Sequence, residues 1–257
     1  MIRHFAAGLG LLFLALAVGA CSKTDENVVQ GWIEADFIFV SPDEQGRVED
    51  MKVREGDRVE TGALLFTLDS ELQRADLGVA EAAFTAAKQN FERAQNLLKA
   101  AAGTQKAYDD AFASYRDTEA RLNAARTRLE RRRAYSPVTG TVHQIYYRPG
   151  ETVPAGKPVL ALLPPGNIKV RFFVPEVMLP RIALGDTIEV SCDGCGAPIE
   201  ARISFISRNA EFTPPVIYSI DERNKLVYLV EARAENVDKL RVGQPVDVRV
   251  HPREVAK

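Results

Sequence analysis

Residues 54–69 read REGDRVETGALLFTLD, and residues 148–163 read RPGETVPAGKPVLALL. The second stretch repeats the first without a gap, ninety-four positions further along the chain. Within residues 46–68, seven positions are identical to their counterparts: Gly46, Val48, Arg54, Gly56, Val59, Gly62 and Leu68 match Gly140, Val142, Arg148, Gly150, Val153, Gly156 and Leu162. This chain of 257 residues therefore contains one small unit twice.

Each copy has the pattern of short strands joined by tight turns. An apolar strand leads to a Gly-Asp or Gly-Glu turn, then to a second glycine turn and another apolar strand. Glycines at these places supply the positive φ that such turns demand. One copy is too small to bury a core, so we expect residues 31–69 and 135–165 to close on each other as a small β-sandwich. Two unrelated hairpins with similar turn chemistry are the alternative.

The stretch between the copies, residues 70–134, contains no proline and is rich in Ala, Gln, Glu and Arg. Large side chains recur every seven residues in two runs, Leu77, Phe84, Phe91 and Leu98, then Tyr108, Tyr115, Leu122 and Leu129. Alanines follow three positions later at Ala80, Ala87, Ala94, Ala111 and Ala125. This heptad pattern predicts two helices in an antiparallel coiled-coil α-hairpin that turns near Gly103. One continuous helix is the alternative.

Arginines crowd the returning arm of the expected hairpin, at Arg116, Arg121, Arg126, Arg128, Arg131, Arg132 and Arg133. Such a run is typical of a solvated helix face. A contact surface for neighbouring copies of the chain is the alternative interpretation.

The C-terminal third, residues 166–251, alternates apolar and polar residues with period two. The expected core-facing groups are Ile168, Val170 and Phe172; Ile188, Val190 and Cys192; Ile199, Ala201, Ile203 and Phe205; Val227 and Leu229; and Val246, Val248 and Val250. Several half-buried strands separated by Gly, Pro and Asp turns predict a compact antiparallel β-barrel. Side chains fill a barrel of this size, so no ligand cavity is expected. Residues 252–257 are expected to form a short tail.

The first residues, MIRHFAAGLGLLFLALAVGAC, are typical of a processed export signal. Arg3 precedes an apolar run from Phe5 to Val18 that is short for a membrane span. Val18 to Cys21 resembles the bacterial lipobox, which implies a signal peptide at 1–20, acylation of Cys21 and a lipidated linker at 21–30. More than one acyl chain is enough for stable anchoring. An uncleaved membrane helix is the alternative. The expected location is the periplasm, anchored by lipid, with the inner membrane favoured.

Besides Cys21, the mature chain contains two cysteines, Cys192 and Cys195. In an oxidising compartment they favour a disulfide or unpaired core thiols over redox catalysis, which needs a thiol at a helix N-terminus. Zinc needs two further ligands, and the mature chain offers only His143 and His251, so no metal is expected. No hydrolase, metalloprotease or nucleotide-binding motif is present. The formal net charge is −2 with both signs interspersed, which does not indicate nucleic-acid binding.

The repeat halves resemble biotinyl/lipoyl domains. A carrier domain of that kind presents its modified lysine on the turn between the halves, and here that turn is occupied by the helical stretch. Met51-Lys52 is similar to the biotin-acceptor dipeptide but precedes the first glycine turn, which is the wrong place. A split lipoyl-like domain, a coiled-coil hairpin and a β-barrel in this order resemble periplasmic adaptors, or membrane fusion proteins, of the HlyD/AcrA type, over nearly all of residues 28–251.

The resemblance implies a non-enzymatic adaptor without a cofactor, which joins an inner-membrane transporter to a TolC-like outer-membrane channel as a ring, commonly of six copies. VRFFVPE (170–176) and AEFTPPVIYS (210–219) look most like members paired with ABC exporters. Channel-docking adaptors carry Arg-x3-Leu-x6-Ser at the hairpin tip. Arg93, Leu97 and Thr104 match that spacing, with Thr in place of Ser. Alternatively, Arg93 and Leu97 are ordinary helix residues and Thr104 is a cap. A covalent carrier protein and a thiol oxidoreductase are the competing functions.

Overall fold

The structure, a computed structural model, describes residues 27–212, 226–234, 240–251 and 253. It contains two compact units, one running from Asp36 to Asn167 and the other built from the chain on either side of that stretch. The expected signal peptide, Cys21 and most of the segment AEFTPPVIYS lie outside the described residues.

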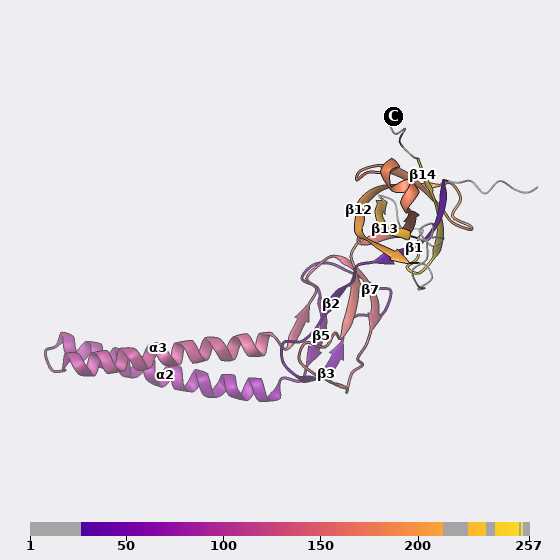
Figure 1. The fold of residues 1–257 in the computed structure, drawn as a ribbon. Helices are drawn as coiled ribbons and strands as arrows, with labels where there is room; N and C mark the ends of the chain where they lie inside the picture. Colours follow the sequence, from indigo (N-terminus) through magenta and orange to yellow (C-terminus); the bar gives the residue numbers. More distant parts are fainter. Residues whose placement is uncertain (1–26, 213–225, 235–239, 252, 254–257) are drawn as a thin grey trace, which may run out of the picture. The chain divides into compact units, whose positions relative to one another are not determined.

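The first unit contains the predicted β-sandwich, whose two sheets each have four strands (Figure 1). One sheet has the order β2-β9-β7-β4 and the other the order β6-β5-β3-β8. The bounds are β2 Ile38–Val40, β3 Gly46–Met51, β4 Arg58–Val59, β5 Leu64–Leu68, β6 Arg133–Tyr135, β7 Gly140–Ile145, β8 Thr152–Val153 and β9 Leu160–Leu163. Each sheet takes strands from both copies of the repeat, so the copies are interleaved.

The two sheets are equivalent strand by strand. A shift of ninety-four residues places β3 on β7 and β4 on β8, and the pairing of Val48 with Leu68 becomes that of Val142 with Leu162. Both pairings contain an irregularity one residue later, at Glu49 and at His143. The turns cross-link the copies reciprocally: Gly56 N–H donates to the Val142 carbonyl and Gly150 N–H to that of Val48, both at 2.8 Å. These two glycines have φ of 91° and 94°, as the turn pattern requires.

The sandwich core draws on both copies. Its buried members are Val40, Val48, Val53, Val59, Leu65, Phe66, Leu68, Val142, Val153, Val159, Leu160 and Leu162. Each copy therefore completes its core with apolar side chains of the other.

The predicted coiled-coil hairpin is confirmed, with α2 at Glu71–Lys99 and α3 at Gln105–Glu130 (Figure 1). Every predicted heptad position is buried or half-buried, and rings from the two helices meet along the seam, as at Phe84–Tyr115 and Phe91–Tyr108. The chain reverses at Gly103, where an added Cβ would lie 3.1 Å from Leu97 Cβ and 3.1 Å from the Leu98 amide nitrogen. A glycine therefore allows the turn to pack against the last residues of α2.

Arg132 and Asp69 join the hairpin to the sandwich. The Arg132 side chain is buried; its Nη1 donates to the Gln45 carbonyl at 2.9 Å, and its Nη2 lies 3.1 Å from Glu44 Oε2. Asp69 Oδ1 accepts from the Glu71 amide at 3.1 Å, which satisfies a donor in the first turn of α2. The helix ends are held beside each other because β5, before α2, pairs with β6, after α3.

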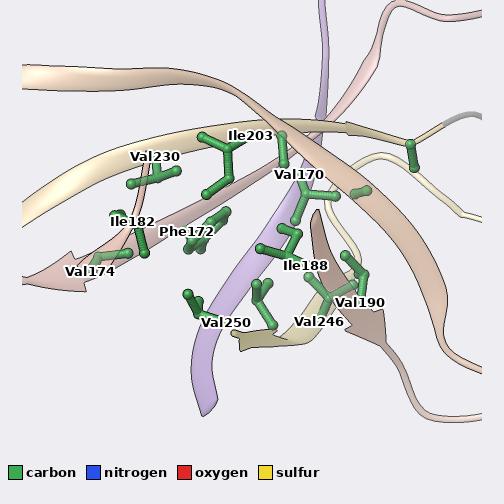
Figure 2. Packing of buried hydrophobic residues seen from close by; sticks show 14 of the residues in the cluster. Val170, Phe172, Val174, Ile182, Ile188, Val190, Ile203, Val230, Val246 and Val250 are labelled. Carbon is green, nitrogen blue, oxygen red and sulfur yellow. The ribbon is translucent and has the colours of Figure 1, made fainter. Parts of the chain in front are cut away.

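The second unit is a closed antiparallel barrel in the order β1-β10-β13-β12-β11-β14, which confirms the predicted fold class. Its elements are β1 Val28–Ala35, β10 Ile168–Pro175, the 3-10 helix Glu176–Arg181, β11 Thr187–Ser191, β12 Ile199–Phe212, β13 Leu226–Ala234 and β14 Pro245–Val250. Figure 2 shows Val170, Phe172 and Val174 of β10 projecting among side chains from the other strands. The interior is thus filled by side chains.

Three details of the barrel differ from the sequence expectation. β1 pairs with β10 and β14, so residues 31–35 complete the barrel and do not belong to the first sandwich half. Phe205 is 48% exposed because the β12–β13 pairing shifts register between Ile203 and Phe205. On β13, the barrel core contains Val230, Ala232 and Ala234, whereas Leu229 is buried outside that cluster and Val227 is only half-buried.

Candidate functional site

The hairpin tip is a short turn closed by backbone hydrogen bonds. The amides of Ala101 and Ala102 donate to the Leu98 and Leu97 carbonyls at 3.0 and 2.9 Å, which satisfies acceptors that the end of α2 leaves open. Ala101 has a φ of 54°, in the left-handed region where a helix commonly ends. The tip therefore has a defined conformation.

Thr104 is the N-cap of α3. Its backbone is extended, and Oγ1 accepts a hydrogen bond from the Ala107 amide at 3.2 Å. Serine and threonine are preferred at this position because their oxygen satisfies a free amide of the first turn. Within the chain, the Thr104 side-chain oxygen therefore acts as a helix cap. The hydroxyl hydrogen can still be donated to a partner, because capping uses only a lone pair.

Arg93 and Leu97 lie one helical turn apart on α2, and both line one shallow hollow with Gln89, Glu92 and Asn96. Leu97 is 45% exposed although it is a large apolar residue, and Arg93 is exposed. Neither occupies a predicted seam position of the heptads. The structure thus brings Arg93 and Leu97 together on an outward surface. Gly103 packs closely against Leu97, and Thr104 is the next residue of the same turn.

Charges at the start of α3 are paired with one another. Lys106 Nζ lies 2.8 Å from Asp110 Oδ2, and this hydrogen bond, with the attraction of the two charges, raises the pKa of Lys106. Gln105 Nε2 donates to Asp109 Oδ1 at 2.9 Å. In contrast, the Arg93 guanidinium has no hydrogen-bond or ion-pair partner within the part of the chain that the structure describes.

Most arginines of the returning arm pair within the chain. The pairs are Arg116–Glu119, Arg121–Asp117, Arg126–Glu81, Arg131–Asp43 and Arg132–Glu44. Apart from buried Arg132, these are exposed pairs of a kind that contributes about 0–1 kcal/mol each. They agree with a solvated face over most of the arm.

Cys192 and Cys195 follow β11 in a glycine turn. Their sulfur atoms lie in bonding contact, with 5.3 Å between the Cα atoms, and the Cys195 amide donates to the Cys192 carbonyl at 3.1 Å. Neither thiol starts a helix, which is the position that activates a catalytic thiolate. Within the described ranges, no group of three or more metal-ligating side chains gathers at one place.

Lys52 lies just beyond the end of β3, 2.6 Å from Asp50 Oδ2. Its hydrogen bond lowers the pKa of Asp50. The turn that joins the sandwich halves is occupied by the hairpin. Among the described helices, none is long and apolar enough to cross a membrane.

Residues 37–163 match the family model for the barrel-sandwich hybrid domain of RND-type membrane fusion proteins. A UPF0194 membrane protein from Acidithiobacillus ferridurans is 28% identical in an alignment that covers 86% of this chain and 86% of that one. A solved membrane fusion protein from Streptococcus pneumoniae R6 is similar with a TM-score of 0.69 at 18% identity, over 88% of this chain and 99% of that one. A MacA–MexA chimera that carries the Pseudomonas aeruginosa MexA α-hairpin gives 0.74 at 21% identity, over 88% and 82%. At these identities the solved structures establish a shared fold.

Proposed function

We propose that the chain is a membrane fusion protein, or periplasmic adaptor, and that it joins an inner-membrane transporter to a TolC-like outer-membrane channel in tripartite export. The observation that carries this proposal is the hairpin, which buries its own seam and presents Arg93 and Leu97 outside that seam at its far end. A helix of 29 residues, as α2 is, extends about 43 Å. That length suits a reach toward a distant partner better than it suits a packed core.

The proposed contact uses different chemistry at each tip residue. Arg93 offers a planar fork of donors to a carboxylate or backbone carbonyl of the channel. Leu97 enters an apolar groove between channel helices, and the Thr104 hydroxyl donates near the turn. Each such contact is small, so its strength comes from repetition around a ring of copies, for which we propose six.

Charge reversal at the tip tests the docking. Arg93→Asp and Leu97→Asp should each cripple export while the chain stays folded and bound to its transporter, because each leaves an unpaired carboxylate at the contact. The matched controls are Arg74→Asp and Val79→Asp, which make the same changes at exposed sites on α2 farther from the tip. Thr104→Ser should be tolerated because it keeps the hydroxyl. Normal export by both tip variants at wild-type abundance would contradict the docking proposal.

For the transporter we propose the ABC type, supported by the resemblance of residues 170–176 to adaptors of that group. The matched family model is named for RND adaptors, so the transporter must be identified directly. Crosslinking in whole cells, purification of the adaptor and mass spectrometry of captured membrane proteins would do so. Recovery of an RND pump without an ABC transporter would refute this assignment.

We also propose that acylated Cys21 attaches the chain to the inner membrane. Cys21→Ser should leave an unprocessed precursor, because the sulfur is the atom that takes the lipid before cleavage. Intact-mass measurement of the wild-type product provides the check. A product without an acyl mass, formed by cleavage that globomycin does not inhibit, would contradict lipidation.

A further inference from the structure

An aromatic face covers the outer side of the sheet β2-β9-β7-β4, and we define it by Phe37, Phe39, His143 and Tyr146. Phe37 stacks on His143 with 4.3 Å between ring centroids, and Phe39 lies 6.5 Å from Tyr146. Both pairs reach across β9, which lies between β2 and β7. Phe39 and Tyr146 are nevertheless 55% and 41% exposed. An exposed cluster of large rings commonly marks a contact surface.

The internal repeat supplies a comparison for this face. The equivalent positions on the sheet β6-β5-β3-β8 hold Arg131, Arg133, Glu49 and Lys52, which we call the charged face. Thr67 pairs with Arg133 just as Ala161 pairs with Phe39, so the backbone positions correspond. One backbone therefore folds with charged side chains on one side and with rings on the other. Folding alone does not account for the exposed rings.

We infer that the aromatic face binds the charged face of a second copy of this chain. Arg133 is exposed and, in the part of the molecule that the structure describes, its guanidinium has no hydrogen-bond or ion-pair partner. Arg131 makes an exposed pair with Asp43 at 3.2 Å. Guanidinium groups stack on the faces of Phe and Tyr, so each face offers what the other lacks.

The geometry of the contact determines the kind of assembly. The two faces are the opposite outer surfaces of one sandwich, so a copy that uses its aromatic face on one neighbour leaves its charged face for another. Such head-to-tail contacts form a ring when the rotation between copies closes. The inference rests on the ring assembly of the proposed function and names the surfaces that would build it.

Cysteine crosslinking tests the pairing in the full-length lipidated chain purified in detergent. Phe39→Cys and Arg133→Cys chains, mixed and oxidised, should give a disulfide-linked dimer, and the double variant should give a ladder of higher species. Neither single variant alone should crosslink above the unsubstituted chain, which keeps Cys192 and Cys195 and sets the background. Glu60→Cys, at an exposed turn of the same sandwich, replaces Arg133→Cys in the matched control.

The outcomes separate this inference from the proposed function. Dimers formed by Phe39→Cys alone would show that the aromatic faces of two copies bind each other. A disulfide between residues 39 and 133 of one chain would show a contact within that chain. Either result overturns the inference. If lysine crosslinking shows an assembly while the cysteine mixture stays monomeric, the assembly uses other surfaces. The inference then fails, whereas the ring of the proposed function stands. If no assembly forms by any method, the ring in the proposed function fails as well.

A charge swap gives the complementary test in solution. Phe39→Lys places a cation against Arg133 and should weaken self-association at least about tenfold, given the loss of a ring–guanidinium contact and the added repulsion. Combining Phe39→Lys with Arg133→Glu should restore association to within about threefold, because the pair becomes oppositely charged. Failure of the double variant to recover, with both variants folded by circular dichroism, would overturn the pairing.

Discussion

The sheet β2-β9-β7-β4 and the sheet β6-β5-β3-β8 have equivalent strands, equivalent turns and matching irregularities at His143 and Glu49. Their inner positions also correspond in chemistry, as at Val48 with Val142 and Leu68 with Leu162. Their outer faces do not, because rings cover one and charges the other. Side chains that are alike at equivalent positions of the two sheets are those that folding requires. Side chains that differ at equivalent positions reflect the separate functions of the two outer faces.

The differences also occur where the chain enters and leaves the hairpin. Ile38 in one sheet corresponds to Arg132 in the other, an arginine that is buried against Gln45 and Glu44. Asp69, which begins the hairpin, corresponds to Leu163, which leads into a Pro-Pro pair. An inserted element therefore replaces apolar residues with charged ones at its base, where helix ends need hydrogen-bond partners.

The largest effects are expected where the sheets agree. Leu68 and Leu162 are 2% and 0% exposed at equivalent positions, so Leu68→Ala and Leu162→Ala should each lower the free energy of unfolding by about 2–5 kcal/mol. The two losses should be similar, since each leucine completes the core of the other copy. Urea unfolding of the purified variants measures both. Leu72→Ala, at an exposed leucine of α2, is the control and should change little. A large loss at one position and none at the other would refute the equivalence.

Intermediate effects are expected at Gly46 and Gly140, which share a position but meet different neighbours. A Cβ at Gly140 would lie 2.7 Å from the Leu163 carbonyl oxygen, whereas one at Gly46 would lie 2.7 Å from Arg132 Nη1. A side-chain tip can move and a strand backbone cannot, so Gly140→Ala should destabilise by about 1–3 kcal/mol and Gly46→Ala by less.

Thermal unfolding of the two glycine variants provides the measurement. Gly78→Ala is the control, because nothing lies within 4 Å of its added Cβ in the middle of α2. It should stabilise by roughly 0.5–1 kcal/mol, since alanine is the better helix former. A greater loss at Gly46 than at Gly140 would show that Arg132 is held more rigidly than the strand.

Much of this architecture was predictable because it follows from local periodicity. The turn glycines, the heptads of residues 77–129 and the alternation in β10 and β14 each reflect a backbone geometry that repeats along the chain. Thr104 as a cap was also accessible from its place before a helix. The Arg93, Leu97 and Thr104 docking role stays a prediction, because it concerns a partner.

The errors arose from pairing between distant segments. Residues 31–35 of β1 directly precede the repeat in sequence, which favours the sandwich, although the partners of β1 are β10 and β14. Strict alternation predicts that Phe205 points inward, because the pattern contains no sign of the register shift. The aromatic face gives no signal among the identities of the repeat, because its signal is the difference between Phe39 and Arg133.

The smallest expected effect concerns Asp69, where the hairpin begins. The Glu71 amide and then Arg47, whose Nη2 lies 2.7 Å from Oδ2, lower the pKa of Asp69. A lowered pKa means that the folded state prefers the carboxylate. Its stabilisation is therefore complete above the ordinary carboxyl pKa of about 4 and is lost as pH falls through the lower folded-state value. Asp69→Asn should melt slightly earlier than wild type at pH 7, and the difference should be smaller at about pH 3, below the ordinary carboxyl pKa. Thermal melts of helical circular dichroism at both pH values measure it, with Asp76→Asn, at an exposed carboxylate of α2, as the control. A difference that persists unchanged at low pH would mean that Asp69 supports the hairpin by its shape as a cap, without its charge.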